Sequence, residues 1–213
     1  DSFVSRGLGD VYKRQTQTAS WADVNNDGHL DLFIGNESNF NQNHPCELYI
    51  NQCNGKFLEQ SEKYKLNNIY GAVKGVVFGD INNDQWPDLF ISVLGGENML
   101  FKNELGIFKD ITYNAGVEEP FYSFPSWIWD VNNDGYNDIF VASYDLRNLS
   151  NLASDFVDEV EGKSVQSEKS KLFINNGDET FTESSVDFNI DISMYAMGSN
   201  FGDIDNDGWL DFY

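Results

Sequence analysis

Apolar residues along this chain occur in short runs that are separated by polar turns rich in asparagine, aspartate and glycine. In the best-defined unit the runs predict strands at residues 75–79, 88–93, 99–103 and 107–112, because they are short, β-branched or aromatic, and bounded by turn residues. The same order of runs recurs before and after this unit. Four antiparallel strands in a repeat of roughly 50 residues are typical of a propeller blade. We therefore predict an all-β chain that forms a partial β-propeller of four-stranded antiparallel blades.

A polar loop joins the first and second predicted strands of every unit. The loops begin at Asp23, Asp80, Asp130 and Asp203, and each carries oxygen-bearing side chains at positions 1, 3, 5 and 9. Calcium takes roughly 6–8 oxygen ligands from carboxylates, amides and backbone carbonyls, so each loop predicts a calcium site in which the position 7 carbonyl adds a ligand. The predicted ligands are Asp23, Asn25, Asp27, His29 and Asp31; Asp80, Asn82, Asp84, Trp86 and Asp88; Asp130, Asn132, Asp134, Tyr136 and Asp138; and Asp203, Asp205, Asp207, Trp209 and Asp211.

Two other interpretations of the loops are weaker. A single copy could be an Asn-Asp-Gly turn with solvated carboxylates, but like charges about 5 Å apart repel by about 3 kcal/mol per pair, and the chain repeats them four times. An EF-hand requires a bidentate glutamate at position 12 and flanking helices, whereas position 12 is Ile34, Ile91 or Val141 within predicted strands. We expect up to four Ca²⁺ ions and no EF-hand.

Position 6 of the loop is glycine in three copies and Gln85 in the second. The chain is expected to need a positive φ there, which glycine adopts without strain. A non-glycine residue in that conformation costs about 1–2 kcal/mol. The second calcium site is therefore predicted to be the weakest.

The loops, the Phe78-Gly79 and Phe201-Gly202 pairs that precede two of them, and hairpins such as residues 100–108 together resemble FG-GAP/VCBS repeats. That family includes the calcium-binding blades of integrin alpha-subunit propellers and many secreted bacterial proteins. The hairpins are most similar to its cartilage-acidic-protein-like branch. The resemblance covers residues 18–213. It implies a propeller whose blades are stiffened by calcium, in a protein of adhesion or extracellular recognition.

The spacing of the units gives three complete blades and part of a fourth. We expect the blades at about residues 18–62, 72–115 and 122–188, with the start of a fourth at 195–213. Residues 1–17 match no part of the repeat, and we expect them to be a non-native leader. A closed ring needs about 4–8 blades, so the chain is expected to be a fragment of a larger propeller.

Composition limits the partners and the location. The net charge of −22 argues against nucleic acid and anionic membrane surfaces, and no apolar run approaches the roughly 18 residues of a membrane span. Weak, exposed calcium loops suit millimolar extracellular calcium, which predicts an extracellular, cell-surface or periplasmic protein. Cys46 and Cys53 could form a local disulfide or remain two thiols, so they do not decide the compartment.

The connections between second and third strands lie on the face opposite the calcium loops and vary most in length, so a protein or glycan ligand is expected there. The longest connection, residues 142–170, predicts an amphipathic helical insertion at about 145–168. We favour the interpretation that its apolar stripe covers a blade edge or the central channel; the alternative is ligand recognition. The stripe consists of Leu146, Leu149, Leu152, Phe156, Val157 and Val160.

The sequence indicates a module that is not an enzyme. His29 and His44 lie on different connections, and no nucleophile motif, phosphate loop or zinc spacing is present. The alternative is a propeller or auxiliary module of an extracellular carbohydrate-active enzyme, with Asp145, Asp155 and Glu159 as local acid candidates. Five aromatic residues could stack on sugars, but we expect them in the core: Trp21, Tyr122, Phe124, Trp127 and Trp129.

Overall fold

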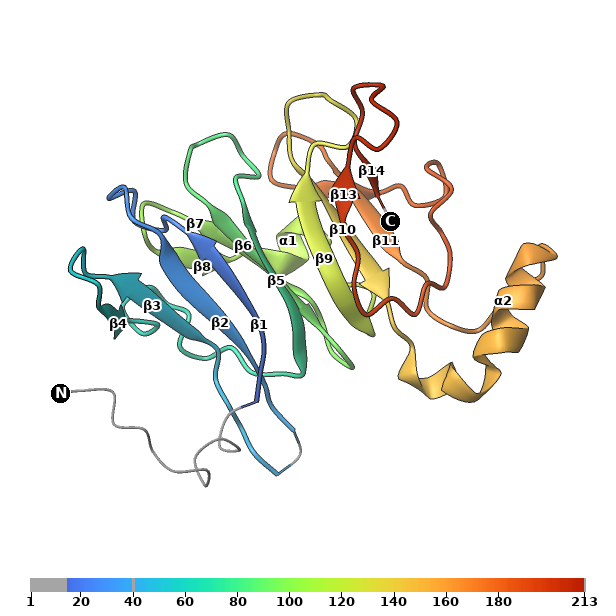
Figure 1. Ribbon diagram of the computed structural model, residues 1–213, viewed down its shortest axis with the longest axis horizontal. Coiled ribbons are helices and arrows are strands. Elements are labelled where there is room, and N and C mark those ends of the chain that lie inside the picture. The colour runs from blue at the N-terminus through green and yellow to red at the C-terminus, as the bar shows by residue number, and fades with distance from the viewer. Residues whose placement is uncertain (1–14, 40, 213) are drawn as a thin grey trace.

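The computed structural model describes residues 15–39 and 41–212, except for the side chains of Asn148, Leu149 and Phe212. The strands of the described residues form three four-stranded antiparallel sheets and one two-stranded hairpin (Figure 1). In each large sheet the strands lie side by side in chain order. The prediction of an all-β chain built from four-stranded antiparallel units is therefore confirmed for three units, which we call sheets 1, 2 and 3.

Each sheet consists of four consecutive strands. Sheet 1 contains β1 (Gln15–Ala22), β2 (Asp31–Glu37), β3 (Glu47–Asn51) and β4 (Phe57–Glu59). Sheet 2 contains β5 (Val73–Gly79), β6 (Asp88–Val93), β7 (Met99–Asn103) and β8 (Phe108–Asp110), followed by the helix α1 (Thr112–Ala115). Sheet 3 contains β9 (Ser123–Trp129), β10 (Asp138–Ser143), β11 (Lys171–Asn175) and β12 (Phe181–Glu183), and the last hairpin pairs β13 (Phe201–Gly202) with β14 (Asp211–Phe212).

The three sheets stack face to face, with β1 beside β5 and β5 beside β9 (Figure 1). Successive side chains of a strand point to opposite faces, so the fully buried strand β6 contributes to two cores. Leu89 and Ile91 lie in the core between sheets 1 and 2, whereas Phe90 lies in the core between sheets 2 and 3. This two-sided burial explains why β6 is a continuous apolar run rather than an alternating one.

The strands of sheet 2 lie within two residues of their predicted bounds, but α1 was not predicted. Strand β1 begins at Gln15, before the predicted start of the repeat at residue 18, because Gln15 and Thr16 pair with Glu37 and Asn36 of β2. Residues 15–17 of the expected leader therefore belong to β1, and the non-native leader itself stays a prediction. The rest of that leader, residues 1–14, lies outside the described residues.

The insertion is helical but shorter than predicted. A 3₁₀ helix (Leu146–Asn151) leads into α2 (Leu152–Val160), which has no buried residue. Phe156 is 65% exposed and Val160 is 73% exposed, so the interpretation that the apolar stripe is covered is wrong for the described residues. Polar contacts hold the helix instead: Asp155 accepts hydrogen bonds from Ser167 and Tyr195, and Glu159 accepts one from the Ser193 backbone. The side chain of Leu149 lies outside the description.

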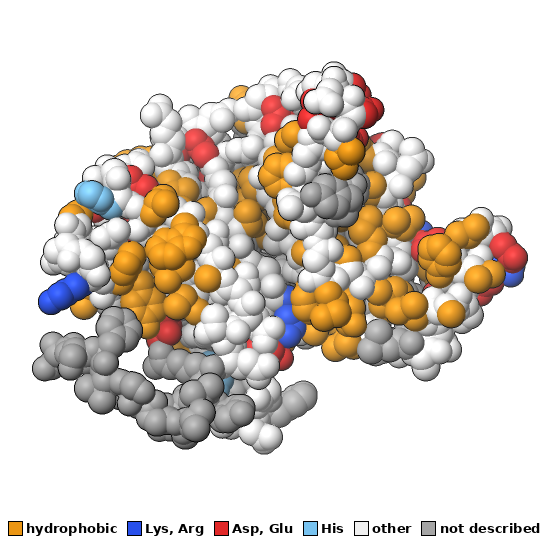
Figure 2. All heavy atoms as spheres, viewed as in Figure 1, with side chains coloured by type: hydrophobic (Ala, Val, Ile, Leu, Met, Phe, Trp, Pro, Cys, Tyr) orange, Lys and Arg blue, Asp and Glu red, His pale blue; other side chains and the backbone are white. Residues whose placement is uncertain are grey.

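Two of the five aromatic residues assigned to the core are buried. Trp127 and Trp129 pack on Phe140 in the core of sheet 3, whereas Tyr122 and Phe124 are partly exposed. Trp21 is 54% exposed, contrary to expectation. Ala22 faces sheet 2, so Trp21, its neighbour in β1, faces the outer side of sheet 1. Figure 2 shows apolar side chains exposed over sheet 1.

Both cysteines are free thiols, Cys46 buried and Cys53 exposed in the turn after β3, so the local disulfide does not form. Within the described residues, neither α2 nor α1 has the length and apolar character that crossing a bilayer requires.

Candidate metal centre

The four Asp-rich loops occupy equivalent places in the fold. They connect β1 to β2, β5 to β6, β9 to β10 and β13 to β14, as predicted. In Figure 1 the second, third and fourth of them extend from the upper end of the sheets. The turns between third and fourth strands lie at the same end, since Asn51 donates its side-chain N–H to the carbonyl of Leu30 in the first loop.

Side-chain oxygens inside each loop organise its backbone. In the second loop, Asp80 accepts N–H bonds from Asp84 and Gln85 at 3.2 and 2.7 Å. The position 5 residue, Asp84, accepts the N–H of Trp86 at 2.9 Å and a side-chain N–H of Asn82 at 3.0 Å. The position 1 and position 5 carboxylates accept the corresponding backbone bonds in the other three loops. The four loops therefore share one conformation.

Position 6 has a positive φ in every loop, including the second, where Gln85 has φ +70°. The expectation that Gln85 occupies a conformation suited to glycine is confirmed. Position 4 also has a positive φ, at Asn26, Asn83, Asn133 and Asn206. Sequence reasoning missed this second constraint, although asparagine at position 4 of all four loops was the available signal, because asparagine tolerates the left-handed region better than most residues.

The fourth loop gathers three carboxylates. Oxygens of Asp203, Asp205 and Asp211, at positions 1, 3 and 9, lie within 4.8 Å of one another, the one such group of acidic, histidine or cysteine side chains in the described residues. Charges this close repel one another unless a cation lies among them, and clustered oxygen donors suit Ca²⁺. The other loops carry asparagine at position 3, so their corresponding set is two carboxylates and an amide. These residues fit a calcium ion.

The structure does not bring every predicted ligand into that group. Asp207, at position 5, lies outside it and accepts the N–H of Trp209 at 2.8 Å. The role of the position 5 carboxylates and the position 7 carbonyls as ligands stays a prediction. His29 is exposed, and its backbone N–H donates to Asp27 at 3.0 Å.

The position 9 aspartates of the first three loops are buried at the base of the loops, whereas Asp211 of the fourth loop is partly exposed. Asp88 accepts the N–H groups of Ile81 and Asn103 at 2.9 and 2.8 Å. Burial raises the pKa of Asp88 to about 7 and that of Asp138 to about 6, against the opposing effect of these backbone bonds. The neighbouring aspartates of each loop raise the pKa further. The pKa of Asp31 is raised for the same reasons. A cation beside these carboxylates would favour their charged forms.

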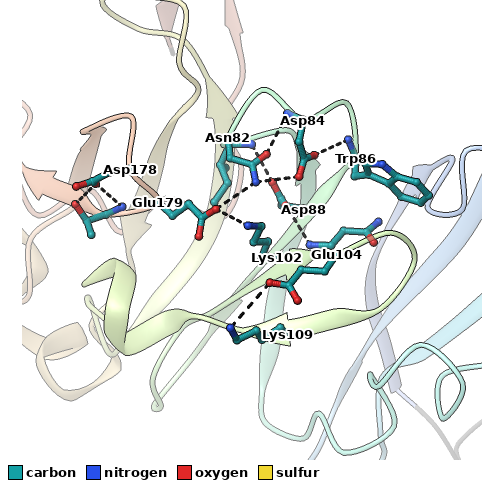
Figure 3. A network of polar contacts seen from close by, with 12 residues as sticks. Asn82, Asp84, Trp86, Asp88, Lys102, Glu104, Lys109, Asp178 and Glu179 are labelled. Atoms are coloured by element: carbon teal, nitrogen blue, oxygen red, sulfur yellow. Dashed lines mark hydrogen bonds and ion pairs between the residues drawn. The ribbon is translucent and has the colours of Figure 1, made fainter.

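A charged pair from two sheets borders the second loop. Figure 3 shows Glu179, from the turn between β11 and β12, pointing toward Lys102 of β7 and Asn82 of the loop. The Lys102 amine contacts the Glu179 carboxylate, and Asn82 donates to the same carboxylate at 3.5 Å. The hydrogen bond to Glu179 raises the pKa of Lys102. Sheet 3 therefore contacts both Lys102 of sheet 2 and Asn82 of the second loop.

The opposite face carries an open groove of about 730 Å³. Its walls come from the β2–β3 connection, the links between sheets and the start of the insertion, and include Asn39, Tyr70, Tyr122 and Leu146. The guanidinium of Arg147 lies 4.6 Å from the ring centre of Tyr122. This groove lies among the connections where a ligand was expected.

The three acid candidates for catalysis have structural partners. Asp145 receives two side-chain hydrogen bonds from Arg147, at 2.8 and 2.7 Å, which hold the pKa of Asp145 below its usual value. Asp155 and Glu159 bind the segment around residues 193–195. A carboxyl with a lowered pKa is poorly suited to act as a general acid.

Comparison with known proteins gives one family. The model of the FG-GAP-like repeat family matches residues 15–91 and 130–213. Among solved structures, the chain is similar to that of an Agrocybe aegerita lectin described for specific recognition of non-reducing terminal N-acetylglucosamine. The identity is 16%, the TM-score is 0.49, and the alignment covers 93% of this chain and 46% of the lectin. A likeness at this level does not bear on function. Curated proteins give no match.

Proposed function

The chain belongs to the FG-GAP-like repeat family, and from this membership we propose that it is a calcium-binding β-propeller module that mediates recognition or adhesion outside the cytoplasm. One observation carries the calcium proposal. The same loop conformation occurs in four copies, and in the fourth it holds three carboxylate oxygens within 4.8 Å of one another. A chain with a net charge of −22 concentrates these charges where a divalent cation would neutralise them.

The chain's own residues would do three things at each site. The aspartates at positions 1 and 9 and the Asp or Asn at position 3 would supply oxygens. Backbone N–H groups orient the position 1 carboxylate, and the residue at position 6 turns the chain back through its positive φ. A bound ion would supply the positive charge that offsets the repulsion among these oxygens. The consequence is a stiff connection between the first and second strands of each unit.

We propose that the three sheets are blades of a propeller. Their stacking through first strands, β1 to β5 to β9, supports this arrangement. The outer side of sheet 1 exposes Trp21 and Phe57, whose rings contact each other, an apolar surface that a further blade would cover.

We propose that ligand recognition occurs on the face opposite the calcium loops, at the groove lined by Tyr70 and Tyr122. Tyrosine rings beside amide and hydroxyl groups suit either a glycan or a protein loop, because they offer both apolar area and hydrogen bonds. A catalytic role is disfavoured because Asp145 is held by Arg147. Millimolar calcium outside the cell would keep loops of moderate affinity filled.

Thermal unfolding tests the calcium proposal. A ligand that binds only the folded state at 100 times its dissociation constant stabilises by about 2.7 kcal/mol. We expect a chelator to lower the melting temperature, and millimolar Ca²⁺ to restore it better than Mg²⁺ does. Asp130→Asn should reduce the calcium response, whereas Asp178→Asn, which removes the same charge outside the loops, should not. A melting curve that is identical in chelator and in calcium would refute the proposal.

A further inference from the structure

Asn103 connects the second loop to the first. Its backbone N–H donates to Oδ1 of Asp88, the position 9 aspartate of its own sheet, at 2.8 Å. Its side-chain Nδ2 donates to the carbonyl of Val24 in the first loop at 2.9 Å. The N–H of Val24 in turn donates to Oδ2 of Asp31, the position 9 aspartate of the first loop, at 3.1 Å. One asparagine therefore links two position 9 carboxylates that belong to different sheets.

Asn175 repeats this connection between the third loop and the second. Its backbone N–H donates to Asp138 Oδ1 at 2.8 Å, and its Nδ2 donates to the carbonyl of Ile81 at 2.7 Å. The N–H of Ile81 donates to Asp88 Oδ2 at 2.9 Å. A continuous series of hydrogen bonds thus runs from Asp31 through Asp88 to Asp138.

This series is buried along its length. Asp31, Asp88, Asp138 and Asn103 are fully buried, and Asn175 is nearly so. Hydrogen bonds in a poorly solvated interior are stronger electrostatically, and breaking one leaves a buried group without a partner. A shift of one carboxylate therefore moves the backbone of the next loop, because water does not replace the hydrogen bonds between them.

A second, exposed set of bonds runs parallel to the first. The position 4 asparagines donate to the position 6 carbonyls of the following loop, Asn26 to Gln85 at 3.2 Å and Asn83 to Gly135 at 2.9 Å. Asn137 also donates to the carbonyl of Asp80 at 2.7 Å. Neighbouring loops therefore touch at both their base and their tip.

We propose that calcium ions bind neighbouring loops with positive cooperativity, and that Asn103 and Asn175 are the positioning residues that couple the sites. This inference rests on the calcium binding proposed above. An ion that fixes Asp88 would also fix Asn103 and, through it, the Val24 carbonyl. The first loop then loses less conformational freedom when its own ion binds, which is positive coupling. By linkage the effect is reciprocal.

Sheet 1 supplies a matched control. Asn51 occupies the place in β3 that Asn103 occupies in β7, and its backbone N–H donates to Asp31 at 2.8 Å. Its side chain, however, donates to Leu30 of its own loop at 3.2 Å rather than to another sheet. Both side chains also accept an N–H in the following turn. Asn51→Ala therefore removes equivalent local bonds without touching the connection between sheets.

The experiment follows amide hydrogen exchange, with Ca²⁺ alone as the ligand, in peptides that cover residues 23–31 and 80–88. Asp80→Ala disables the second site, and the readout is the calcium concentration that gives half-protection of the first loop. We expect Asp80→Ala to raise that concentration about fivefold in the parent chain, a typical coupling. The same increase is expected in Asn51→Ala, and no increase is expected in Asn103→Ala.

Each other outcome has a defined meaning. If calcium protects no loop, the calcium proposal itself fails. If calcium protects the loops but Asp80→Ala leaves the first loop unchanged in the parent, the sites are independent and the coupling is refuted. A fivefold increase that persists in Asn103→Ala refutes the role of this asparagine. Should Asn103→Ala not fold, Asn103→Asp keeps the acceptor for Gly106 and removes the donor, with Asn51→Asp as the control of equal charge.

Discussion

Gly79 of β5 lies against Ile128 of β9 so closely that a Cβ atom on the glycine would be 2.4 Å from the Cγ2 atom of the isoleucine. The packing of sheet 2 on sheet 3 therefore requires glycine at this position of the Phe-Gly pair. Its backbone φ is not in the left-handed region, so close approach rather than backbone strain excludes a side chain here.

Gly79→Ala is expected to destabilise the chain by about 1–3 kcal/mol, the usual cost of overpacking a core. Urea or thermal unfolding measures the change. Gly202→Ala is the matched control, because this glycine of the second Phe-Gly pair has no atom within 4 Å of its added Cβ. Equal effects of the two substitutions would contradict the packing argument.

The second prediction concerns Gln85, which is held at φ +70° where the other loops have glycine. Gln85→Gly should relieve about 1 kcal/mol of strain, which corresponds to roughly fivefold tighter calcium binding at the second site. Gly135→Gln should weaken the third site by a similar factor, since Gly135 has φ +92°. Calorimetric titration with Ca²⁺ checks both variants. If the calcium affinity changes in neither variant, strain at position 6 does not determine affinity.

The third prediction concerns the pH dependence of stability without calcium. The pKa of Asp88 is about 7 in the folded chain and about 4 in an unfolded chain. Between these values the folded state binds more protons than the unfolded state, so stability rises as the pH falls from about 7 to about 4. Because Asp88 is fully buried, the gain is on the order of a few kcal/mol.

Denaturant unfolding at several pH values, in chelator, measures this dependence. Asp88→Asn should flatten the dependence, whereas Asp84→Asn, an exposed position of the same loop, should not. Calcium should also flatten it, by holding the carboxylate in its charged form. The prediction is contradicted if Asp88→Asn keeps the slope of the parent chain.

Local patterns were enough to predict most of the fold. The apolar runs of sheet 2, and the asparagine- and glycine-containing segments between them, gave β6 and β7 at their observed bounds, because strand length and turn chemistry are local properties. The conformation at Gln85 followed from its place in a repeated loop.

Contacts between distant segments could not be predicted. The bond from Asn103 to Val24 joins residues 79 positions apart, and nothing in either segment indicates its partner. The exposed stripe of α2 was misinterpreted for the same reason: helical spacing of apolar residues says that a face exists, but not what lies against it. The polar residues that hold the helix, Asp155 and Glu159, were considered only as acids.

The last prediction separates the two faces of α2. Because Phe156 is 65% exposed, Phe156→Ser should change the free energy of unfolding by no more than about 0.5 kcal/mol, as for other surface substitutions. Asp155→Ala should cost about 1 kcal/mol or more, because it removes the acceptor for Ser167 and Tyr195 and leaves partly buried hydroxyl groups without that partner. Tyr195→Phe removes one donor only and should fall between the two. Unfolding curves give the three values, and limited proteolysis at residues 161–166 reports whether the insertion has come loose. A large loss of stability in Phe156→Ser, with little effect of Asp155→Ala, would mean that the apolar face is covered in solution and that α2 is held by its stripe after all.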